Sequence, residues 1–374
     1  MKVAIFHDYL NQYGGAERVL EVFFEMFPEA DLYTLFYDRE KLGGLFEKNL
    51  KKTSFLDLSL VKRKHRYFIP FFPLACTLMK VKEQYDLVIS SSAGYAKGFS
   101  FKDESKKPYH LSYCHTPLRY AWESFYLKDS IFKPKFLLDF FYFYFVNKLR
   151  KWDKKAADRV NFFIANSSYI ASKIEKVYQR NAVVVYPPVD NNIFYPENLK
   201  RENFYLMVGR MLYYKKFDLA IQAFNVLKKP LKIVGTGPDY KNFKKIAKSS
   251  LIEFLGEVTD EQLRKLYSQA KGFIFPQVED FGLVLAEAQS CGLPAIAFGY
   301  GGAQDIIEDK RTGLFFYQQN VFELIQKIKI FEKMDFDNNY IALRARKLFS
   351  KERFKKRIIE ILKNLGFLLN NNNL

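Results

Sequence analysis

The sequence is poor in cysteine. Only three occur among 374 residues, Cys76, Cys114 and Cys291, and none lies in a short Cys-x-x-Cys spacing. This pattern excludes a disulfide-stapled secreted domain and a zinc module. It favours a reducing compartment, so we expect a cytoplasmic protein. The chain also opens on MKVAIFHDYL, which indicates a strand rather than a signal peptide.

Long apolar runs are missing as well. The longest candidate, FLLDFFYFYFV (136–146), contains Asp139 and is too short to span a bilayer. The first strand is not followed by G-x-G-x-x-G, which argues against a dinucleotide-dependent oxidoreductase. No helix-turn-helix, finger or base-stacking motif occurs, so we expect no nucleic acid partner, although a basic nucleic-acid-binding protein would explain the charge.

The formal net charge is +18, from 59 basic and 41 acidic residues, and it is unevenly distributed. Residues 51–180 hold 25 basic and 11 acidic side chains, whereas residues 251–300 hold 3 basic and 7 acidic ones. An excess of this sign suits a polyanionic partner such as an anionic lipid surface or a phosphate-bearing substrate. Plain solvation of lysine-rich surface helices explains it equally well.

Short, continuously apolar segments alternate with helical patterns along most of the chain, which predicts parallel sheets covered on both faces. The expected strands are 2–9, 30–36, 85–92, 110–114, 161–167 and 182–188, then 204–210, 231–235, 252–256, 272–276, 293–298 and 313–316. The segment 187–203 is rich in proline and asparagine, which indicates a linker. We therefore predict an α/β protein with two doubly wound, Rossmann-like domains, 1–190 and 200–350, facing across a cleft.

The most informative motif is VEDFGLVLAEAQSCGLP (278–294). Glu279 follows an expected strand, Phe281 and Gly282 come next, and a helix is expected to start near Leu283 and to carry Glu287. Such a helix start offers free N–H groups and a positive dipole to a phosphate, while flanking carboxylates accept hydrogen bonds from sugar hydroxyls. Two glutamates eight apart are a weak signal alone, and the surrounding residues make it specific.

Cations and glycines follow other expected strands. In GRMLYYKKFD (209–218), Gly209 and Arg210 end a strand, and Lys215 or Lys216 on the next loop is the second candidate phosphate ligand. Gly14 and Gly15 open a helix after the first strand, where backbone amides approach a phosphate closely or the chain simply turns.

Two polar residues end strands in the first half. His115 is a candidate for contacting a substrate hydroxyl, although a histidine in this position is more often structural. Asn166 stands before Ser167, which is equally well explained as a helix N-cap. A nucleophilic pair of Cys114 and His115 is disfavoured, because adjacent residues of a strand point to opposite faces.

With these motifs the sequence resembles the retaining glycosyltransferases of family 4, which have the GT-B fold. The resemblance covers roughly residues 1–365. The runs HDYL…GGAERVLE, VISSSAGYAKG and YCHTPLRYAWE look like the mannosyltransferase-type branch that builds bacterial surface polysaccharide. The chain departs from the usual pattern at Lys216, where glycine is common. In this fold a terminal helix, here about 351–368, returns to the first domain.

The resemblance implies roles for the candidate residues. Glu279, Arg210, Lys215 and His115 would be catalytic, with His115 touching the transferred sugar. The substrate-binding set would be Gly14, Gly15, Asn166, Gly209, Gly235, Gly237, Val258, Phe281, Gly282, Leu283 and Glu287. In relatives GTGP (235–238) lies beside the nucleotide, and the backbone near Val258 meets the base.

The implied reaction is transfer of a hexose, with mannose from GDP-mannose favoured, to a hydroxyl of a glycan or lipid-linked acceptor. No Asp-x-Asp pair stands after a strand, so no metal or other cofactor is expected. The segments 62–73 and 132–145 either contact an anionic membrane or fill core positions. A sugar-nucleotide epimerase of the same fold, or a basic membrane-binding protein, is the alternative.

Overall fold

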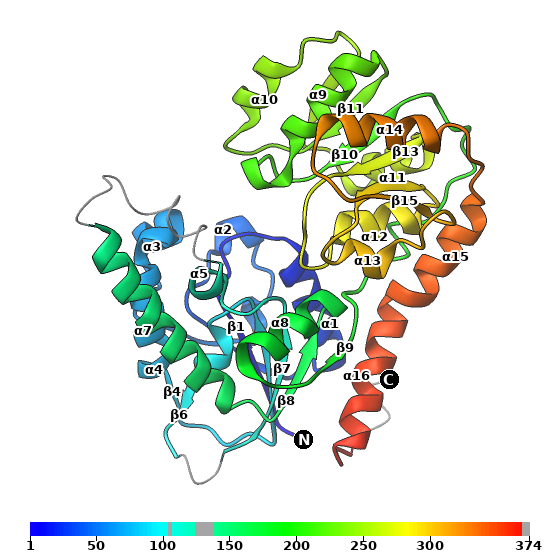
Figure 1. Ribbon diagram of the computed structural model, residues 1–374. Coiled ribbons are helices and arrows are strands. Elements are labelled where there is room, and N and C mark those ends of the chain that lie inside the picture. Colours follow the sequence, from blue (N-terminus) through cyan, green and yellow to red (C-terminus); the bar gives the residue numbers. More distant parts are fainter. Residues whose placement is uncertain (104–106, 124–137, 369–374) are drawn as a thin grey trace. The chain divides into compact units, whose positions relative to one another are not determined.

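The computed structural model describes residues 1–103, 107–123 and 138–368 (Figure 1). The chain divides into two compact units. The first comprises Met1–Val185 together with the segment from Lys355 onward, and the second comprises Tyr186–Phe354. Each unit is built on its own parallel sheet. The prediction of an α/β protein with two Rossmann-like sheets is therefore confirmed.

The sheet of the first unit has seven strands in the order β3-β2-β1-β5-β7-β8-β9, and all neighbours are parallel. Its strands are β1 (Val3–His7), β2 (Asp31–Thr34), β3 (Leu50–Thr53), β5 (Leu87–Ser92), β7 (Tyr109–Cys114), β8 (Phe162–Ala165) and β9 (Ala182–Val184). A separate pair joins β4 (Lys80–Val81) to β6 (Ser100–Phe101). The chain reverses its winding direction between β1 and β5, which is where open α/β sheets bind ligands.

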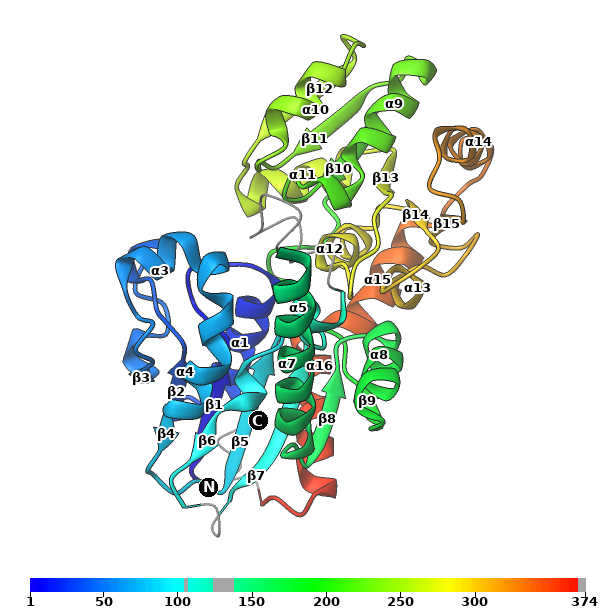
Figure 2. The ribbon, with the colours of Figure 1, turned by 60° about the vertical axis from the view of Figure 1, so that its left-hand side comes forward.

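Helices cover both faces of this sheet. They are α1 (Gly15–Met26), α2 (Arg39–Leu42), α3 (Ser59–Lys64), α4 (Phe72–Leu78), α5 (Arg119–Trp122), α7 (Leu138–Asp158) and α8 (Ser168–Tyr178), with 3-10 turns η1 (Glu47–Asn49), η2 (His65–Phe71) and η3 (Ala96–Gly98). Phe6 and Val88 pack with Phe72 of α4 and Leu149 of α7 in one core cluster. Figure 2 shows α4 and α7 beside the strands of this unit.

The sheet of the second unit has the order β12-β11-β10-β13-β14-β15, again all parallel. Its strands are β10 (Tyr205–Val208), β11 (Leu231–Val234), β12 (Ile252–Gly256), β13 (Gly272–Phe275), β14 (Ala295–Phe298) and β15 (Gly313–Phe316). This is the doubly wound dinucleotide-fold order, with its switch point between β10 and β13. All six strands were predicted from apolar runs, and each lies within the expected range or matches it.

Both faces of this second sheet are buried, as the continuous apolar runs predicted. Tyr205 and Met207 of β10 join one core cluster, and the alternating residues Leu206 and Val208 join the other. The first cluster includes α9 (Phe217–Leu227), α10 (Tyr240–Ile246) and α14 (Val321–Phe331). The second includes α11 (Asp260–Gln269), α12 (Leu283–Ser290), α13 (Ala303–Ile306) and α15 (Asn338–Phe349).

Several parts of the chain differ from what the sequence predicted. The edge strand β3 and the short strands β4 and β6 were not predicted, because each has too few apolar residues to show a pattern. The expected linker packs on the second unit, where Val189 and Phe194 are buried in its core. The terminal helix α16 (Lys351–Asn364) was predicted to within a few residues. The aromatic segment 132–145 lies partly outside the described residues.

Candidate active site

In the second unit, the loops that follow β10 and β13 meet at the switch point of the sheet. The ammonium group of Lys215, in the 3-10 turn η5 (Tyr213–Lys215), forms an ion pair with the carboxylate of Glu279. The two side chains are 17% and 21% exposed, so both remain reachable from solvent. Sequence reading selected both residues separately, and the structure brings them together at the ligand-binding edge of the sheet.

The loop after β10 has an unusual backbone. Gly209 adopts φ 154°, and Lys216 adopts the left-handed conformation with φ 56° at the N-cap of α9. Glycine adopts this region without the steric cost that a side chain brings. Lys216 therefore has the left-handed backbone that glycine adopts most easily, at the position where the resemblance to family 4 led us to expect glycine.

Two glycines after β11 lie against the same loop. A Cβ atom on Gly235 would come within 2.1 Å of the carbonyl oxygen of Gly209, and one on Gly237 within 2.4 Å of the carbonyl oxygen of Met211. The N–H of Met211 donates to the carbonyl of Thr236 at 2.8 Å. The two glycines of GTGP are therefore required for close packing of the loop after β11 against the loop after β10.

The helix α12 begins next to Glu279. Its N-cap is Gly282, with φ 103°, and Phe281 before it is buried in the core. Glu287 on the same helix is only 2% exposed, and its carboxylate lies 3.5 Å from the hydroxyl of Tyr267. Leu283 is the first helical residue. The sequence therefore placed this helix start correctly, including the glycine.

The glycine loop after β14 supports the Glu279 loop, a role that sequence reading did not assign. The N–H of Gly302 donates to the carbonyl oxygen of Glu279 at 2.8 Å. A Cβ on Gly301 would lie 2.6 Å from that same oxygen, and one on Gly302 would lie 2.2 Å from the carbonyl oxygen of Phe281. The signal was present in GYGG (299–302), but the partner loop was not apparent from the sequence.

Two further candidates stand near these loops. Arg210 is exposed directly after Gly209, and Val258 is half-buried against the core after β12. A hydrogen bond of 2.6 Å joins the hydroxyl of Thr236 to Glu257, tying together the loops after β11 and β12. Thr236 belongs to the GTGP segment selected from the sequence, but its contact with Glu257 was not expected.

In the first unit, hydrogen bonds to both the backbone and the ring of His115 fix its position. Its N–H donates to the carbonyl of Ser92 at 2.8 Å, and its own carbonyl accepts from the amide of Asn166 at 3.0 Å. Asn166 and His115 were both selected from the sequence, and here one fixes the position of the other. Ser167 caps α8 by accepting from the N–H of Ile170, as the structural alternative predicted.

The ring of His115, which is partly buried, contacts a buried polar cluster of Ser91, His7 and Glu17 that was not predicted from the sequence. Its Nε2 lies 2.9 Å from the hydroxyl of Ser91, which lies 3.1 Å from Nδ1 of His7. Nε2 of His7 is 3.5 Å from Glu17, whose other carboxylate oxygen accepts from the N–H of Gly14 at 2.8 Å. The Gly14 amide is thus engaged by Glu17, and α1 starts at Gly15.

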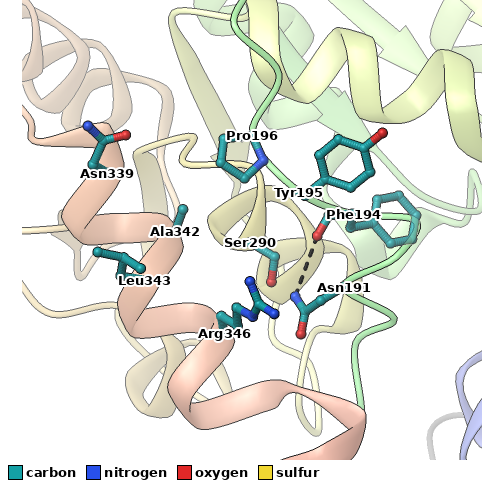
Figure 3. Close-up of a pocket in the computed structure, with 9 residues that line it drawn as sticks. All are labelled: Asn191, Phe194, Tyr195, Pro196, Ser290, Asn339, Ala342, Leu343 and Arg346. Carbon is teal, nitrogen blue, oxygen red and sulfur yellow. Dashed lines mark hydrogen bonds between the residues drawn. The ribbon is translucent and has the colours of Figure 1, made fainter.

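A cavity of about 340 Å³ lies elsewhere in the second unit (Figure 3). Its lining residues are Asn191, Phe194, Tyr195, Pro196, Ser290, Asn339, Ala342, Leu343 and Arg346. Ser290 is the last residue of α12, whereas Glu279 and Gly282 stand before its first. The cavity is therefore at the opposite end of that helix from the loops that carry the candidate residues.

Within the described ranges, no three His, Cys, Asp or Glu side chains are grouped so as to hold a metal ion. The helices of those ranges include none long and apolar enough to cross a bilayer. The three cysteines are buried, and none of them forms a disulfide.

The fold is that of the GT-B glycosyltransferases. The Anabaena protein HepE, whose crystal structure contains UDP, superposes with a TM-score of 0.71 over 97% of this chain and 100% of that one, at 16% identity. At this identity the likeness establishes the architecture alone.

Residues 189–348, which lie in the second unit, match the family described as glycosyl transferases group 1. An uncharacterized glycosyltransferase of Methanocaldococcus jannaschii is 30% identical over 185 residues, which are 48% of this chain and 52% of that protein. This chain therefore spans about half of that relative. The O-antigen chain mannosyltransferase C of Escherichia coli is 25% identical over 82% of this chain and 81% of its own.

Proposed function

We propose that the protein is a retaining glycosyltransferase that moves a hexose from a nucleoside diphosphate sugar to a hydroxyl group. The observation that carries the proposal is the Lys215–Glu279 ion pair beside the N-terminus of α12, at the switch point of a group 1 domain. A cation, a carboxylate and a helix start at one sheet edge match the phosphates and hydroxyls of such a donor.

In this proposal each group of the second unit has one task. Arg210 and Lys215 bind the diphosphate and stabilise the negative charge that develops as it leaves. Glu279 accepts hydrogen bonds from hydroxyls of the transferred sugar, and Glu287 accepts from the ribose diol. The backbone near Val258 contacts the base, and Gly209, Gly235 and Gly237 let the phosphates approach the main chain.

The transfer breaks the bond between the anomeric carbon and the phosphate oxygen, and it forms a bond from that carbon to the acceptor oxygen on the same face. The acceptor proton goes to an oxygen of the departing phosphate. Catalysis is then mainly electrostatic, through groups already oriented toward the leaving charge. We propose that no metal takes part, so activity should persist in excess EDTA.

For the donor we propose GDP-mannose. The similarity to the O-antigen chain mannosyltransferase extends over 82% of the chain, which supports a mannosyl donor and an acceptor in surface polysaccharide synthesis. UDP-glucose is the competing donor, because HepE of Anabaena binds UDP and glucose in its crystal structure on the same fold.

The test is a thermal-shift screen with GDP, UDP and ADP and their sugars, followed by product analysis. A nucleotide that binds only the folded protein at about 100 times its Kd stabilises it by about 2.7 kcal/mol. We expect GDP and GDP-mannose to raise the Tm and mannose to reach an acceptor with its anomeric configuration kept. No shift with any nucleotide would contradict the proposal.

The same experiment distinguishes a glycosyltransferase from a sugar-nucleotide epimerase. A sugar-nucleotide epimerase of this fold would convert the donor without an acceptor and release no transferred product. We expect donor consumption to depend on the acceptor.

We further propose that the acceptor is lipid-linked and that the protein acts at the inner face of the cell membrane. The segment Phe55–Leu78 carries seven large apolar side chains that are each at least 50% exposed: Phe55, Leu58, Leu60, Tyr67, Phe71, Leu74 and Leu78. Arg63, Lys64 and Arg66 are exposed among them. Buried Val61, Ile69 and Phe72 anchor the segment to the core. This combination suits insertion into an anionic lipid surface.

A further inference from the structure

The chain Glu17–His7–Ser91–His115 joins four side chains from α1 and from the ends of β1, β5 and β7. Glu17, His7 and Ser91 are all buried. The contacts are 3.5 Å from Glu17 to Nε2 of His7, 3.1 Å from Nδ1 of His7 to the hydroxyl of Ser91, and 2.9 Å from that hydroxyl to Nε2 of His115.

The chemistry of these groups determines which atom donates and which accepts in each hydrogen bond. Glu17 lies 3.5 Å from Nε2 of His7, which is an electrostatic contact longer than an ordinary hydrogen bond, and a carboxylate at this place favours a proton on that nitrogen. Nδ1 of a neutral His7 then accepts, and the hydroxyl of Ser91 donates to it. The oxygen of Ser91 accepts in turn from Nε2–H of His115. The reverse order would require protons on both nitrogens of His7.

We propose that Glu17, His7 and Ser91 are positioning residues that hold His115 as its Nε2–H tautomer and so make Nδ1 the acceptor nitrogen of this ring. A substrate hydroxyl that contacts the ring then does so as a hydrogen-bond donor. This proposal rests on the proposed function for its consequence in catalysis, whereas the tautomer itself is measurable without substrate.

The variant Glu17→Gln reverses the chain with little change of shape. Its amide oxygen keeps the hydrogen bond from the Gly14 N–H, and its NH₂ group faces His7 and donates to Nε2. Nδ1 of His7 then donates to Ser91, Ser91 donates to Nε2 of His115, and the proton of His115 moves to Nδ1. The variant Ser91→Ala removes the link and leaves the tautomer unlocked.

The residue before Ser91 on strand β5, Ser90, provides a matched control. Ser90 makes a similar buried contact, 2.8 Å, with Nε2 of His110. Because successive strand residues point to opposite faces, that pair lies on the other side of the sheet from Ser91. Ser90→Ala therefore removes an equivalent buried hydrogen bond and leaves the contacts among Glu17, His7, Ser91 and His115 in place.

The experiment is long-range ¹H–¹⁵N NMR of the full-length protein labelled at histidine, with the His115 signals assigned from His115→Gln. We expect the Nε2–H tautomer in the wild type and in Ser90→Ala, the Nδ1–H tautomer in Glu17→Gln, and a mixture in Ser91→Ala. An Nδ1–H tautomer in the wild type would overturn the proposal. So would a His115 signal unchanged in both Glu17→Gln and Ser91→Ala.

Transfer assays on the same variants test whether the tautomer of His115 affects catalysis. We expect Glu17→Gln and Ser91→Ala to lower kcat by about tenfold, with the Kd for the donor nucleotide within about twofold of wild type. Ser90→Ala should keep its kcat. Absence of transfer by the wild type would refute the proposed function and leave the tautomer result standing, whereas an unchanged kcat in both chain variants would refute the positioning role.

Discussion

The backbone N–H of Gly302 donates a hydrogen bond of 2.8 Å to the carbonyl oxygen of Glu279. The contact joins the loop after β14 to the loop after β13, so the glycine fixes the main chain from which the Glu279 carboxylate projects. The side chain of Glu279 is in turn paired with Lys215 on the loop after β10. Three loops at one edge of the sheet are thereby coupled.

Gly302→Ala should displace the Glu279 loop and lower transfer activity by at least tenfold. The added Cβ would meet the carbonyl oxygen of Phe281 at 2.2 Å, which is backbone and cannot rotate away. We expect the free energy of unfolding to fall by about 1–3 kcal/mol, as for other overpacked positions. Enzyme kinetics and urea unfolding measure the two effects.

Gly299→Ala is the matched control in the same loop. Its Cβ would meet the ring of Tyr317 at 2.5 Å, but that ring belongs to an exposed side chain that can turn outward. Activity should stay within about twofold of wild type. An equal loss in both variants would show that the loop, rather than the Glu279 contact, is sensitive.

Glu279→Ala and Lys215→Met should each lower the transfer rate by about 10²–10³ while leaving the protein folded. Glu279 is expected to hold the sugar and Lys215 to stabilise the leaving diphosphate. Since both side chains are partly exposed, their removal leaves no buried unpaired charge of the kind that unfolds proteins. Activity of Glu279→Ala within about twofold of wild type would contradict its assigned role.

Lys216→Gly decides between the two adjacent lysines. Glycine suits the left-handed backbone of this residue, so the loop geometry is retained while the charge is removed. We expect transfer within about threefold of wild type, because Lys215 rather than Lys216 pairs with Glu279. A loss as large as that of Lys215→Met would reassign the phosphate ligand.

Stability should fall in acid partly because of His110. Burial, together with the nearby Arg159 and Lys97, lowers the pKa of this imidazole from 6.5 to about 3. The folded state therefore holds His110 neutral, whereas the unfolded chain takes up a proton below its own pKa of about 6.5. The contribution to stability is complete above about pH 6.5 and is lost progressively as the pH falls toward 3.

His110→Gln tests this linkage, because glutamine offers an amide to Ser90 and does not titrate. Between pH 6.5 and about pH 5, the wild type should lose up to about 1.4 kcal/mol per pH unit more than the variant. The free energy of unfolding in urea, measured at several pH values, gives the difference in slope. Parallel curves for the two proteins would rule out the assigned protonation.

The exposed segment Phe55–Leu78 should bind anionic vesicles. Each apolar side chain that enters the bilayer contributes about 1.5–3 kcal/mol, and each nearby lysine or arginine about 1 kcal/mol. The double variant Phe71→Ser/Leu74→Ser should therefore lower the partition coefficient at least tenfold in a flotation assay with phosphatidylserine vesicles. Both residues are half exposed, so the fold should be unaffected.

Phe322→Ser/Leu343→Ser provides the control, because these side chains are even more exposed than Phe71 and Leu74 but belong to the second unit. Its binding should equal that of the wild type. Equal binding of the wild type to neutral and anionic vesicles would refute the electrostatic part of the proposal.

Much of the fold was predictable from local patterns. The twelve strands expected from apolar runs are all present, and the helix start at Leu283 was placed from the glycine before it and the helix formers after it. The short strands β4 and β6 have two residues each, too few for periodicity to appear. Phe194 was assigned to a linker because prolines and asparagines surround it, yet its ring is buried in the second unit.

The candidate site was predictable only as separate pieces. Glu279, Lys215 and His115 were each selected because they follow a strand. Ser91, His7 and Glu17 were not, since a serine within a strand and a histidine at its end carry no distinctive pattern.

The order of apolar and polar residues along this chain, by itself, determined the alternation of strands and helices and hence the two parallel sheets, because backbone periodicity is a local property. Only the tertiary structure decided which lysine meets Glu279, which glycine supports it, and which side chains orient His115. Those contacts join residues 64 positions apart for Lys215 and Glu279, and 84 for His7 and Ser91, which only the packing of whole elements brings together.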